Sequence, residues 1–383
     1  MPVSSPSPAV PHQSLAPGGR GDFLLVACQG GAEAALCAGQ QQVLPQLTKG
    51  VWRRGVVTFR LPAAAAGQPA FDPPDDFFPD LAFARAVIRS LGQVAGATTA
   101  ERIEKIIALI GSTNWDNVHV WFRDPRAAAR AESETDPVAV RAAILTALRR
   151  AGVQTMGDDP IARPGDLILD CVIDEGGRWW IGWHRAATPP SCWSGGLYPG
   201  ALPADKVSRA WLKLDEALAT FTVPLAAGER AVELGAAPGG ACQRLLEAGL
   251  HVTGIDPALV DARVARHPQF EQWRMRARDV RLKNLRGFDW VVADMNIDPK
   301  STLEALGRVV TAPGSRPRGI IATLKLPEWS RAVALPEWLA QFRAWGYAPQ
   351  ARQLSTGGRE VCVAAFKTRA SRRPRHATRR SDA

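Results

Sequence analysis

The feature that most constrains the fold is an apolar run that breaks into a glycine-rich turn, AVELGAAPGG at residues 231–240. A second apolar run, HVTGID, follows it and ends on Asp256. Glycine permits a sharp turn and a close approach of the backbone to a ligand. A carboxylate at the end of the next strand can accept hydrogen bonds from both hydroxyls of a ribose. The pattern therefore predicts a nucleoside-binding edge of an α/β sheet.

The spacing of the glycines indicates which kind of nucleoside cofactor the turn could bind. The turn lacks the G-x-G-x-x-G fingerprint that places a dinucleotide pyrophosphate at a helix N-terminus, and the chain contains no G-x-x-x-x-G-K-[ST] loop for a triphosphate. A compact cofactor such as S-adenosylmethionine fits the turn better.

Length and composition predict two domains, or three small ones. The chain has 383 residues, 46% of them hydrophobic, which is enough for two cores. It has no membrane-length apolar run, and its leader lacks the apolar segment of a secretory signal, so we expect a cytoplasmic protein with no membrane contact. Six cysteines are scattered without a C-x-x-C pair, which argues against a structural metal and against a disulfide framework.

The charge favours a polyanionic partner. The formal net charge is +10, and each phosphate that a Lys or Arg neutralises releases counterions, so nucleic acid is the partner that this balance favours. The basic tail SRRPRHATRRSDA contributes five of the arginines, and many proteins of arginine-rich proteomes are basic. The charge therefore supports a nucleic-acid partner without identifying one.

A segment rich in Pro, Gly and Ser at residues 188–205 divides the chain, so we expect one domain at 21–190 and a second at 205–369. A leader at 1–20 and a basic tail at 370–383 are predicted to be disordered. The first half is predicted to be α+β, with strands at 22–30, 55–62, 117–125 and 166–174 and helices at 100–111 and 137–152. The second half is predicted to be an open α/β sheet, with a helix at 208–221 and strands at 230–235, 251–256, 288–295, 319–326 and 359–367.

Four ionisable residues of the second half stand where a purely structural role is difficult to argue: Lys213, Asp294, Lys325 and Glu360. If the four converge, the two lysines would lower each other's pKa, so that one could act as a base, and the carboxylates would limit the repulsion. Such a set could take a proton from a weakly acidic hydroxyl, as methyl transfer to a hydroxyl requires. Taken singly, each has a structural alternative, a helix cap for an Asp and a solvated edge position for a Lys.

The segments SRAWLKLDEAL, VELGAAPGG, VVADM, TLKLP and ARQLSTGGREVCV resemble the bacterial RlmM family, which methylates the 2'-O-ribose of a cytidine in 23S rRNA. The likeness extends over the whole chain, with FLLVACQGGAEAALCAG, VRAAILTALRRAGV and DLILDCVID in the first half. It implies a Rossmann-like, S-adenosylmethionine-dependent methyltransferase domain of the RrmJ/FtsJ type. An α+β region of ferredoxin-like and THUMP type, which binds RNA, would precede it.

The resemblance also implies roles for particular residues. Lys213, Asp294, Lys325 and Glu360 would form a catalytic tetrad in which Lys325 accepts the proton of the ribose 2'-hydroxyl. The implied cofactor contacts are Gly235, Ala237, Pro238, Gly239, Gly240, Asp256, Asp279 and Asp294. Where the family has a serine ahead of the first lysine, this chain has Ala210, so that contact would pass to the backbone or to Ser208.

The implied partner is 23S rRNA, unassembled or partly assembled into the large subunit, and the implied protein is a monomer or weak homodimer without a metal. Two alternatives stay open. One is 2'-O-methylation of another RNA, of cap type or tRNA, and the other is an RNA-binding protein whose methyltransferase fold is inert. Base-amine methylation is disfavoured because DMNIDP replaces a [D/N/S]-P-P-[Y/F/W] element, and cytosine-C5 methylation because neither Cys242 nor Cys362 follows a proline.

Aromatic and basic residues of the first half have two interpretations. Trp179, Trp180, Trp183 and Trp193 could stack on bases of an RNA loop, but filling a core is the more common role of such side chains. An RNA-facing surface could include Arg85, Arg123, Arg126, Arg149 and Arg150.

Overall fold

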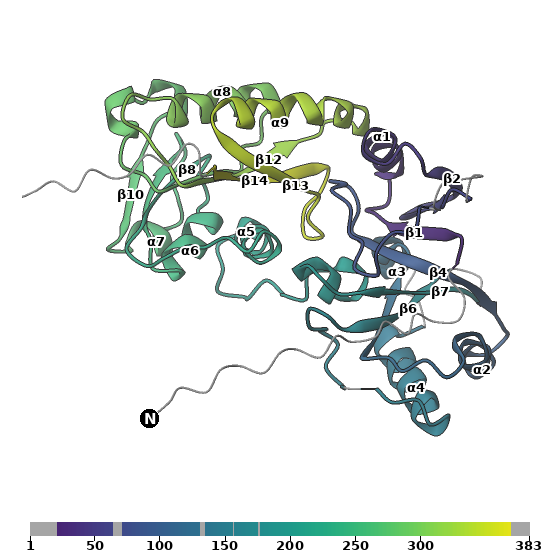
Figure 1. Cartoon of the computed structure of the whole chain (residues 1–383). Helices are drawn as coiled ribbons and strands as arrows, with labels where there is room; N and C mark the ends of the chain where they lie inside the picture. The colour runs from purple at the N-terminus through teal and green to yellow at the C-terminus, as the bar shows by residue number, and fades with distance from the viewer. Residues whose placement is uncertain (1–20, 64–70, 131–134, 156, 175–176, 369–383) are drawn as a thin grey trace, which may run out of the picture.

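The computed structural model describes residues 21–63, 71–130, 135–155, 157–174 and 177–368. The predicted disorder of 1–20 and 370–383 falls on residues outside these ranges. Within them, the chain forms two seven-stranded sheets, one from each half of the sequence (Figure 1). No helix in the described ranges is long and apolar enough to cross a membrane.

The first sheet has the strand order β2-β3-β1-β4-β7-β6-β5, and every pair is antiparallel except β5 with β6. Its strands are β1 (Phe23–Ala27), β2 (Thr48–Arg53), β3 (Val56–Arg60), β4 (Ala86–Ala95), β5 (Asn117–Phe122), β6 (Leu167–Ile173) and β7 (Arg178–Arg185). Its helices are α1 (Glu33–Val43), α2 (Thr99–Ile110), α3 (Pro125–Arg130) and α4 (Pro137–Arg150). The predicted α+β composition is confirmed, and β2, β4 and β7 are additional strands.

Helices α2 and α4 follow from local sequence signals. Each begins at an N-cap whose side chain accepts backbone N–H groups, Thr98 for α2 and Asp136 for α4. The isoleucines of α2 recur at helical spacing and are buried on one face. Both helices bury that apolar face in one cluster with side chains of β5, β6 and β7.

The four tryptophans between residues 179 and 193 are buried in the core. Trp179 and Trp183 of β7 are each 1% exposed, and Trp180 and Trp193 are also buried. Side chains buried to this degree cannot stack on RNA bases. The core interpretation is therefore the correct one for all four.

The predicted basic surface is only partly present. Arg123 is buried and forms an ion pair with Asp174 at 2.6 Å, so its inclusion in an RNA-facing surface was wrong. The Nε and Nη2 atoms of Arg85 are also buried. By contrast, the side chains of Arg149 and Arg150 are exposed.

The second sheet has the order β10-β9-β8-β11-β12-β14-β13, in which β14 runs antiparallel to both of its neighbours and the other pairs are parallel. Its strands are β8 (Arg230–Leu234), β9 (His251–Ile255), β10 (Phe270–Trp273), β11 (Trp290–Ala293), β12 (Gly319–Lys325), β13 (Tyr347–Arg352) and β14 (Glu360–Lys367). The chain runs outward from β8 to β10 and then returns to β11. The predicted Rossmann-like sheet is confirmed, with β10 and β13 as additional strands.

Helices cover both faces of this sheet. Figure 1 shows α8 (Pro299–Val310) and α9 (Leu335–Ala344) along one face, and α5 (Arg209–Thr220), α6 (Gly240–Glu247) and α7 (Ala262–Ala265) along the other. Apolar side chains of β8 and β11 alternate between the two faces, so each face has its own buried cluster. The sheet edge where the strands end is left for polar side chains.

The two halves of the chain share an apolar contact. Phe83 packs edge-on against Trp329, with ring centroids 6.2 Å apart. Helix α1 contacts η6 (Trp329–Ala334), and buried residues of both halves form one continuous cluster. We propose 21–190 and 205–369 as the two domains, joined through this contact.

A test of the first core compares two tryptophans of the same sheet. We predict that Trp179→Ala destabilises the protein by about 3–5 kcal/mol, because it leaves a cavity between β7 and the helices. Trp52→Ala should cost under about 1 kcal/mol, because Trp52 is 44% exposed on β2. Chemical denaturation followed by circular dichroism measures both. Equal losses in the two variants would contradict the core assignment.

Candidate active site

The site lies where the strand order of the second sheet reverses. Strands β8 and β11 are neighbours there, and their carboxyl ends lead into Gly235 and Asp294. Strand β9, on the other side of β8, leads into Asp256. Crevices outside the carboxyl ends of strands at such a reversal are the usual ligand sites of open α/β sheets.

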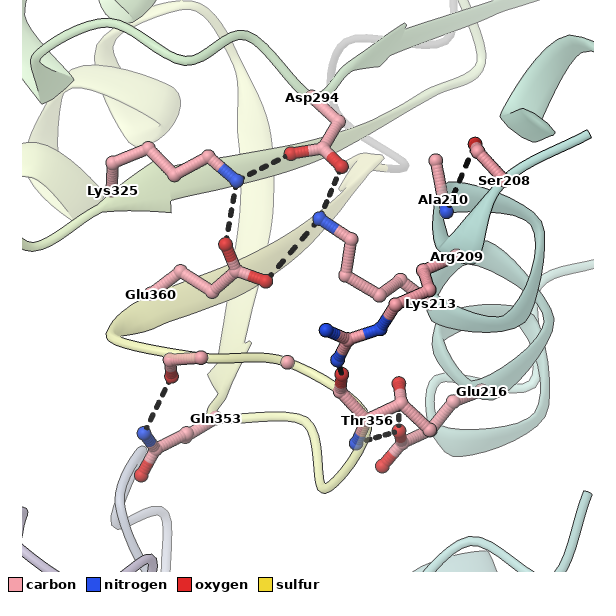
Figure 2. A network of polar contacts seen from close by, with 12 residues as sticks. Ser208, Arg209, Ala210, Lys213, Glu216, Asp294, Lys325, Gln353, Thr356 and Glu360 are labelled. Atoms are coloured by element: carbon pink, nitrogen blue, oxygen red, sulfur yellow. Dashed lines mark hydrogen bonds and ion pairs between the residues drawn. The ribbon is translucent and has the colours of Figure 1, made fainter. Parts of the chain in front are cut away.

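Two lysines and two carboxylates form a closed ring at this edge (Figure 2). Lys325 Nζ donates to Asp294 Oδ1 at 2.7 Å and to Glu360 Oε2 at 2.5 Å. Lys213 Nζ donates to the other oxygen of Asp294 and lies 3.3 Å from Glu360 Oε1. The structure thus brings together all four residues that the sequence singled out.

Each member of the ring is placed by a different element. Lys325 and Glu360 face each other directly in the antiparallel pairing of β12 with β14. Asp294 follows β11, which is the other neighbour of β12. Lys213 comes from α5, whose N-cap Ser208 accepts the backbone N–H of Ala210 at 3.3 Å.

The electrostatics of the ring differ from the expectation in one respect. For Asp294, burial favours the neutral acid, but the two ammonium groups outweigh it and lower the pKa. For Lys325, burial favours the neutral amine, but Asp294 and Glu360 outweigh it and raise the pKa above its usual value. The expected mutual lowering of the lysine pKa values was therefore wrong for Lys325, because the carboxylates do more than limit the repulsion. Lys325 is an ammonium at neutral pH.

A cavity of about 670 Å³ adjoins the ring at Asp294. Four of the predicted cofactor residues line it: Gly235, Ala237, Asp256 and Asp294. Residues that the sequence analysis did not identify form much of the remaining wall, among them Ile255, Arg276, Ala277, Met295 and Ile297. Apolar walls beside a carboxylate suit a purine nucleoside, since the base can be buried while the ribose hydroxyls are bonded.

Gly235 is required by the shape of this cavity. Its φ of +80° lies in the left-handed region, and a Cβ there would stand 2.6 Å from Met295 Cγ. Asp256 fixes the next turn, because its carboxylate accepts the N–H groups of Ala237 at 3.1 Å and Ala258 at 2.8 Å. The residues present therefore fit a nucleoside cofactor.

The other predicted cofactor contacts lie outside the cavity lining. A Cβ at Gly240 would meet Ser208 Oγ at 2.3 Å, so this glycine lets α6 pack closely on α5. Gly239 caps α6 in a left-handed conformation, and Asp279 is exposed beside Arg278. Pro238 is likewise not part of the lining. Ala210 lines a separate small cavity with Lys213 and Asp294.

Glu233 is a buried acid that the sequence analysis overlooked. It lies within β8 at 2% exposure, and one of its carboxylate oxygens has no hydrogen-bond partner. Burial raises its pKa to about 8. An acidic residue inside an otherwise apolar strand, as in AVELG, is the signal that identifies such a group.

Comparisons with known proteins agree with this geometry. Residues 206–325 match the family model of FtsJ-like methyltransferases, a range that includes Lys213, Asp294 and Lys325. A curated protein of Xanthomonas oryzae pv. oryzae (strain MAFF 311018), named ribosomal RNA large subunit methyltransferase M, is 29% identical over 75% of this chain and 83% of its own length. A protein of the same name from Halorhodospira halophila is 29% identical over 83% of this chain and 87% of its own length.

Among solved structures, the fibrillarin pre-rRNA processing protein of Methanococcus jannaschii is 12% identical over 51% of this chain and 81% of that one. Its TM-score is 0.34, which is too low to carry an argument. The assignment of the fold therefore depends on the sheet order and the family match.

The buried acid of β8 generates a test by pH. The pKa of Glu233 is raised to about 8 from its ordinary value of 4.5, so the folded protein keeps a proton that the unfolded chain releases between these values. Its contribution to stability is present below pH about 4.5 and is lost as the pH rises towards about 8. Gln is neutral at every pH, so the melting temperature of Glu233→Gln should gain a few degrees over wild type between pH 5 and 8. If the difference in melting temperature between Glu233→Gln and wild type does not change with pH across this range, the raised pKa of Glu233 is contradicted.

Proposed function

We propose that this chain, an S-adenosylmethionine-dependent methyltransferase with an FtsJ-like domain, methylates the ribose 2'-hydroxyl of a cytidine in 23S rRNA. The observation that carries the proposal is the position of Asp294, which lines the cofactor cavity and also holds both lysines of the ring. A cofactor in this cavity and the proposed base, Lys325, would then lie on the two sides of one carboxylate. The curated relatives, named as large-subunit ribosomal RNA methyltransferases, support the same substrate.

The chemistry divides between the cavity and the ring. S-adenosylmethionine supplies the methyl group as an electrophilic sulfonium. Asp256 would accept hydrogen bonds from the ribose hydroxyls of the cofactor, and the turn at Gly235 leaves room for it near the backbone. Lys325 accepts the proton of the target 2'-hydroxyl at Nζ, while Lys213 and Asp294 orient the reacting groups.

The protonation state of Lys325 shapes the pH dependence of this reaction. Its raised pKa means that the resting amine carries a proton, which must be lost before Nζ can act as a base. The fraction of neutral Lys325 grows as the pH rises towards that pKa. The rate should therefore increase through the alkaline range.

Two other kinds of RNA methylation are disfavoured, because the residues that each commonly uses are not placed for it. Cytosine-C5 methylation needs a reactive thiolate, but Cys242 and Cys362 are buried, and burial raises the pKa of each thiol. Methylation of a base amine commonly uses an aromatic residue after Pro-Pro at the end of the fourth strand, where β11 is followed by DMNIDP. A ribose hydroxyl is the acceptor that the ring of amines and carboxylates suits.

The first half of the chain is proposed to supply RNA binding, as a ferredoxin-like and THUMP region. Its exposed arginines and the net charge of +10 would attract the phosphate backbone. We further propose that the substrate is free or partly assembled large-subunit RNA in the cytoplasm, and that the protein acts as a monomer or weak homodimer.

Mapping of 2'-O-methyl groups on RNA tests the proposed function. Large-subunit rRNA from cells without the gene should lack one ribose methyl group, at a cytidine, that wild-type rRNA carries. A plasmid copy of the gene should restore it. A missing group on tRNA instead would move the substrate to tRNA, and unchanged RNA would favour an inert methyltransferase fold.

A pair of variants separates transfer from cofactor binding. Lys325→Ala should lower kcat by about 10²- to 10⁴-fold, the usual contribution of a positioned general base, and should leave the cofactor Kd unchanged. Asp256→Ala should raise the cofactor Kd by about tenfold or more through the lost hydrogen bonds. Calorimetry with S-adenosylmethionine and single-turnover assays measure the two effects. Normal turnover in Lys325→Ala would remove this residue from the base role.

A further inference from the structure

Glu216 is a buried carboxylate that the proposed mechanism does not use. It lies on α5 at 2% exposure. Its Oε1 accepts the backbone N–H of Ser355 at 2.7 Å and the hydroxyl at 2.9 Å, and its Oε2 accepts the corresponding groups of Thr356 at 2.8 and 2.6 Å. All four donors come from one loop, between β13 and β14. Figure 2 shows this carboxylate directed at the loop rather than at the ring.

The two ends of this contact both lead to the ring. Glu216 follows Lys213 by three residues, so the two side chains leave α5 on adjacent turns of one side. The loop, residues 354–358, is separated by only one residue from Glu360 at the start of β14. Glu216 therefore joins the helix that carries one amine of the ring to the loop that precedes one of its carboxylates.

The loop also packs directly against Glu360. A Cβ at Gly357 would stand 3.0 Å from Glu360 Oε1 and 3.4 Å from its Cγ, so the loop backbone packs against this side chain. A second bond from α5, Arg209 Nη2 to Thr356 O at 3.0 Å, reinforces the position of the loop. A shift of the loop would therefore displace the carboxylate that holds Lys325 and Lys213.

We propose that Glu216 is a positioning residue for methyl transfer: by anchoring loop 354–358 on α5, it sets the distance between Glu360 and the two lysines. The inference rests on the proposed function, because it concerns the same ring. A buried carboxylate is costly unless its oxygens are bonded, and an apolar side chain would fill this position at lower cost if packing were its purpose. Glu216 instead uses both carboxylate oxygens to accept hydrogen bonds from the loop.

The first half of the chain contacts the same loop. Arg126 Nη2 donates to Gly357 O at 2.6 Å, and Tyr198 N, in the segment between the halves, donates to Ser355 Oγ at 3.0 Å. The residue before the loop, Gln353, donates its N–H to Ala82 O at 2.7 Å and its amide to Gly358 O at 3.1 Å. Glu216 is thus the catalytic-domain anchor of a loop that the first half also holds.

The pKa of Lys325 reports the position of Glu360, because Glu360 is one of the groups that raise it. When Glu216→Ala releases the loop, Glu360 should move from the ring, and the pKa of Lys325 should fall. Glu360→Gln removes the negative charge of this carboxylate altogether, so it should also lower the pKa of Lys325. Competitive acylation of Lys325 across a pH series, read by mass spectrometry on the full chain, measures this pKa without requiring methyl transfer.

Asp215 supplies the matched control. It is the neighbouring residue of α5 and accepts from Arg244 Nε at 2.7 Å and from the Tyr198 hydroxyl at 2.5 Å. Tyr198 contacts the loop through its backbone N–H, which Asp215→Asn leaves in place. Asp215→Asn, like Glu216→Ala, should lower the melting temperature, but it should leave kcat and the pKa of Lys325 at wild-type values. In Glu216→Ala, kcat should fall on the order of 10- to 100-fold, as expected for a misplaced catalytic group, with the cofactor Kd unchanged.

The combined variant Glu216→Ala with Glu360→Gln should lower kcat little beyond Glu360→Gln alone, because both act through one carboxylate.

If Glu216→Ala does not fold, Glu216→Gln keeps one acceptor oxygen for the loop and should lower the pKa of Lys325 by a smaller amount. A pKa of Lys325 that stays at the wild-type value in the folded Glu216 variant, or that falls equally in Asp215→Asn, overturns the positioning role. Failure of the proposed function would appear separately, as absence of ribose methylation by the wild-type protein.

Discussion

The antiparallel pairing of β12 with β14 is the contact on which the site depends. It places Lys325 opposite Glu360, so the first ion pair of the ring is set by strand register rather than by side-chain flexibility. A shift of one residue in this register would turn Glu360 to the other face of the sheet. Because β11 is the other neighbour of β12, the same sheet also brings Asp294 to the ring.

The ring solves the problem of burying four ionisable groups together. Each carboxylate lies between two amines and each amine between two carboxylates, so every charge has opposite neighbours. Loss of one partner from such a buried set leaves an uncompensated charge, which costs about 3–5 kcal/mol. The arrangement has a chemical consequence as well, since the carboxylates that hold the amines also keep Lys325 protonated at rest.

Much of this organisation could be predicted from the sequence. The strand runs of the second half were enough to predict a nucleoside-binding edge at the glycine turn and Asp256, because carboxyl ends of parallel strands meet at one edge. The resemblance to a known family implied the set of Lys213, Asp294, Lys325 and Glu360. Strands β4 and β7 escaped prediction: β4 contains Gly92 within its run, and the tryptophans of β7 admit more than one interpretation.

Quantities that depend on distance could not be predicted. The direction of the Lys325 pKa follows from contacts of 2.5 and 2.7 Å, which no spacing in the sequence reveals. Likewise, the cavity wall at Met295 and Ile297 comes from the segment after β11, whose path the strand pattern does not define. The close packing of α6 on α5 at Gly240 is likewise a feature that the spacing of the glycines does not reveal.

Two contacts join the halves of the chain: Phe83 packs against Trp329, and Arg126 donates to the loop before Glu360. These contacts have a consequence for how such proteins diversify. A domain that contacts a loop of its neighbour cannot be exchanged freely for another domain, because the replacement must reproduce the same contacts. The two halves would therefore be inherited as a pair, and chimaeras between distant relatives would need matched substitutions on both sides.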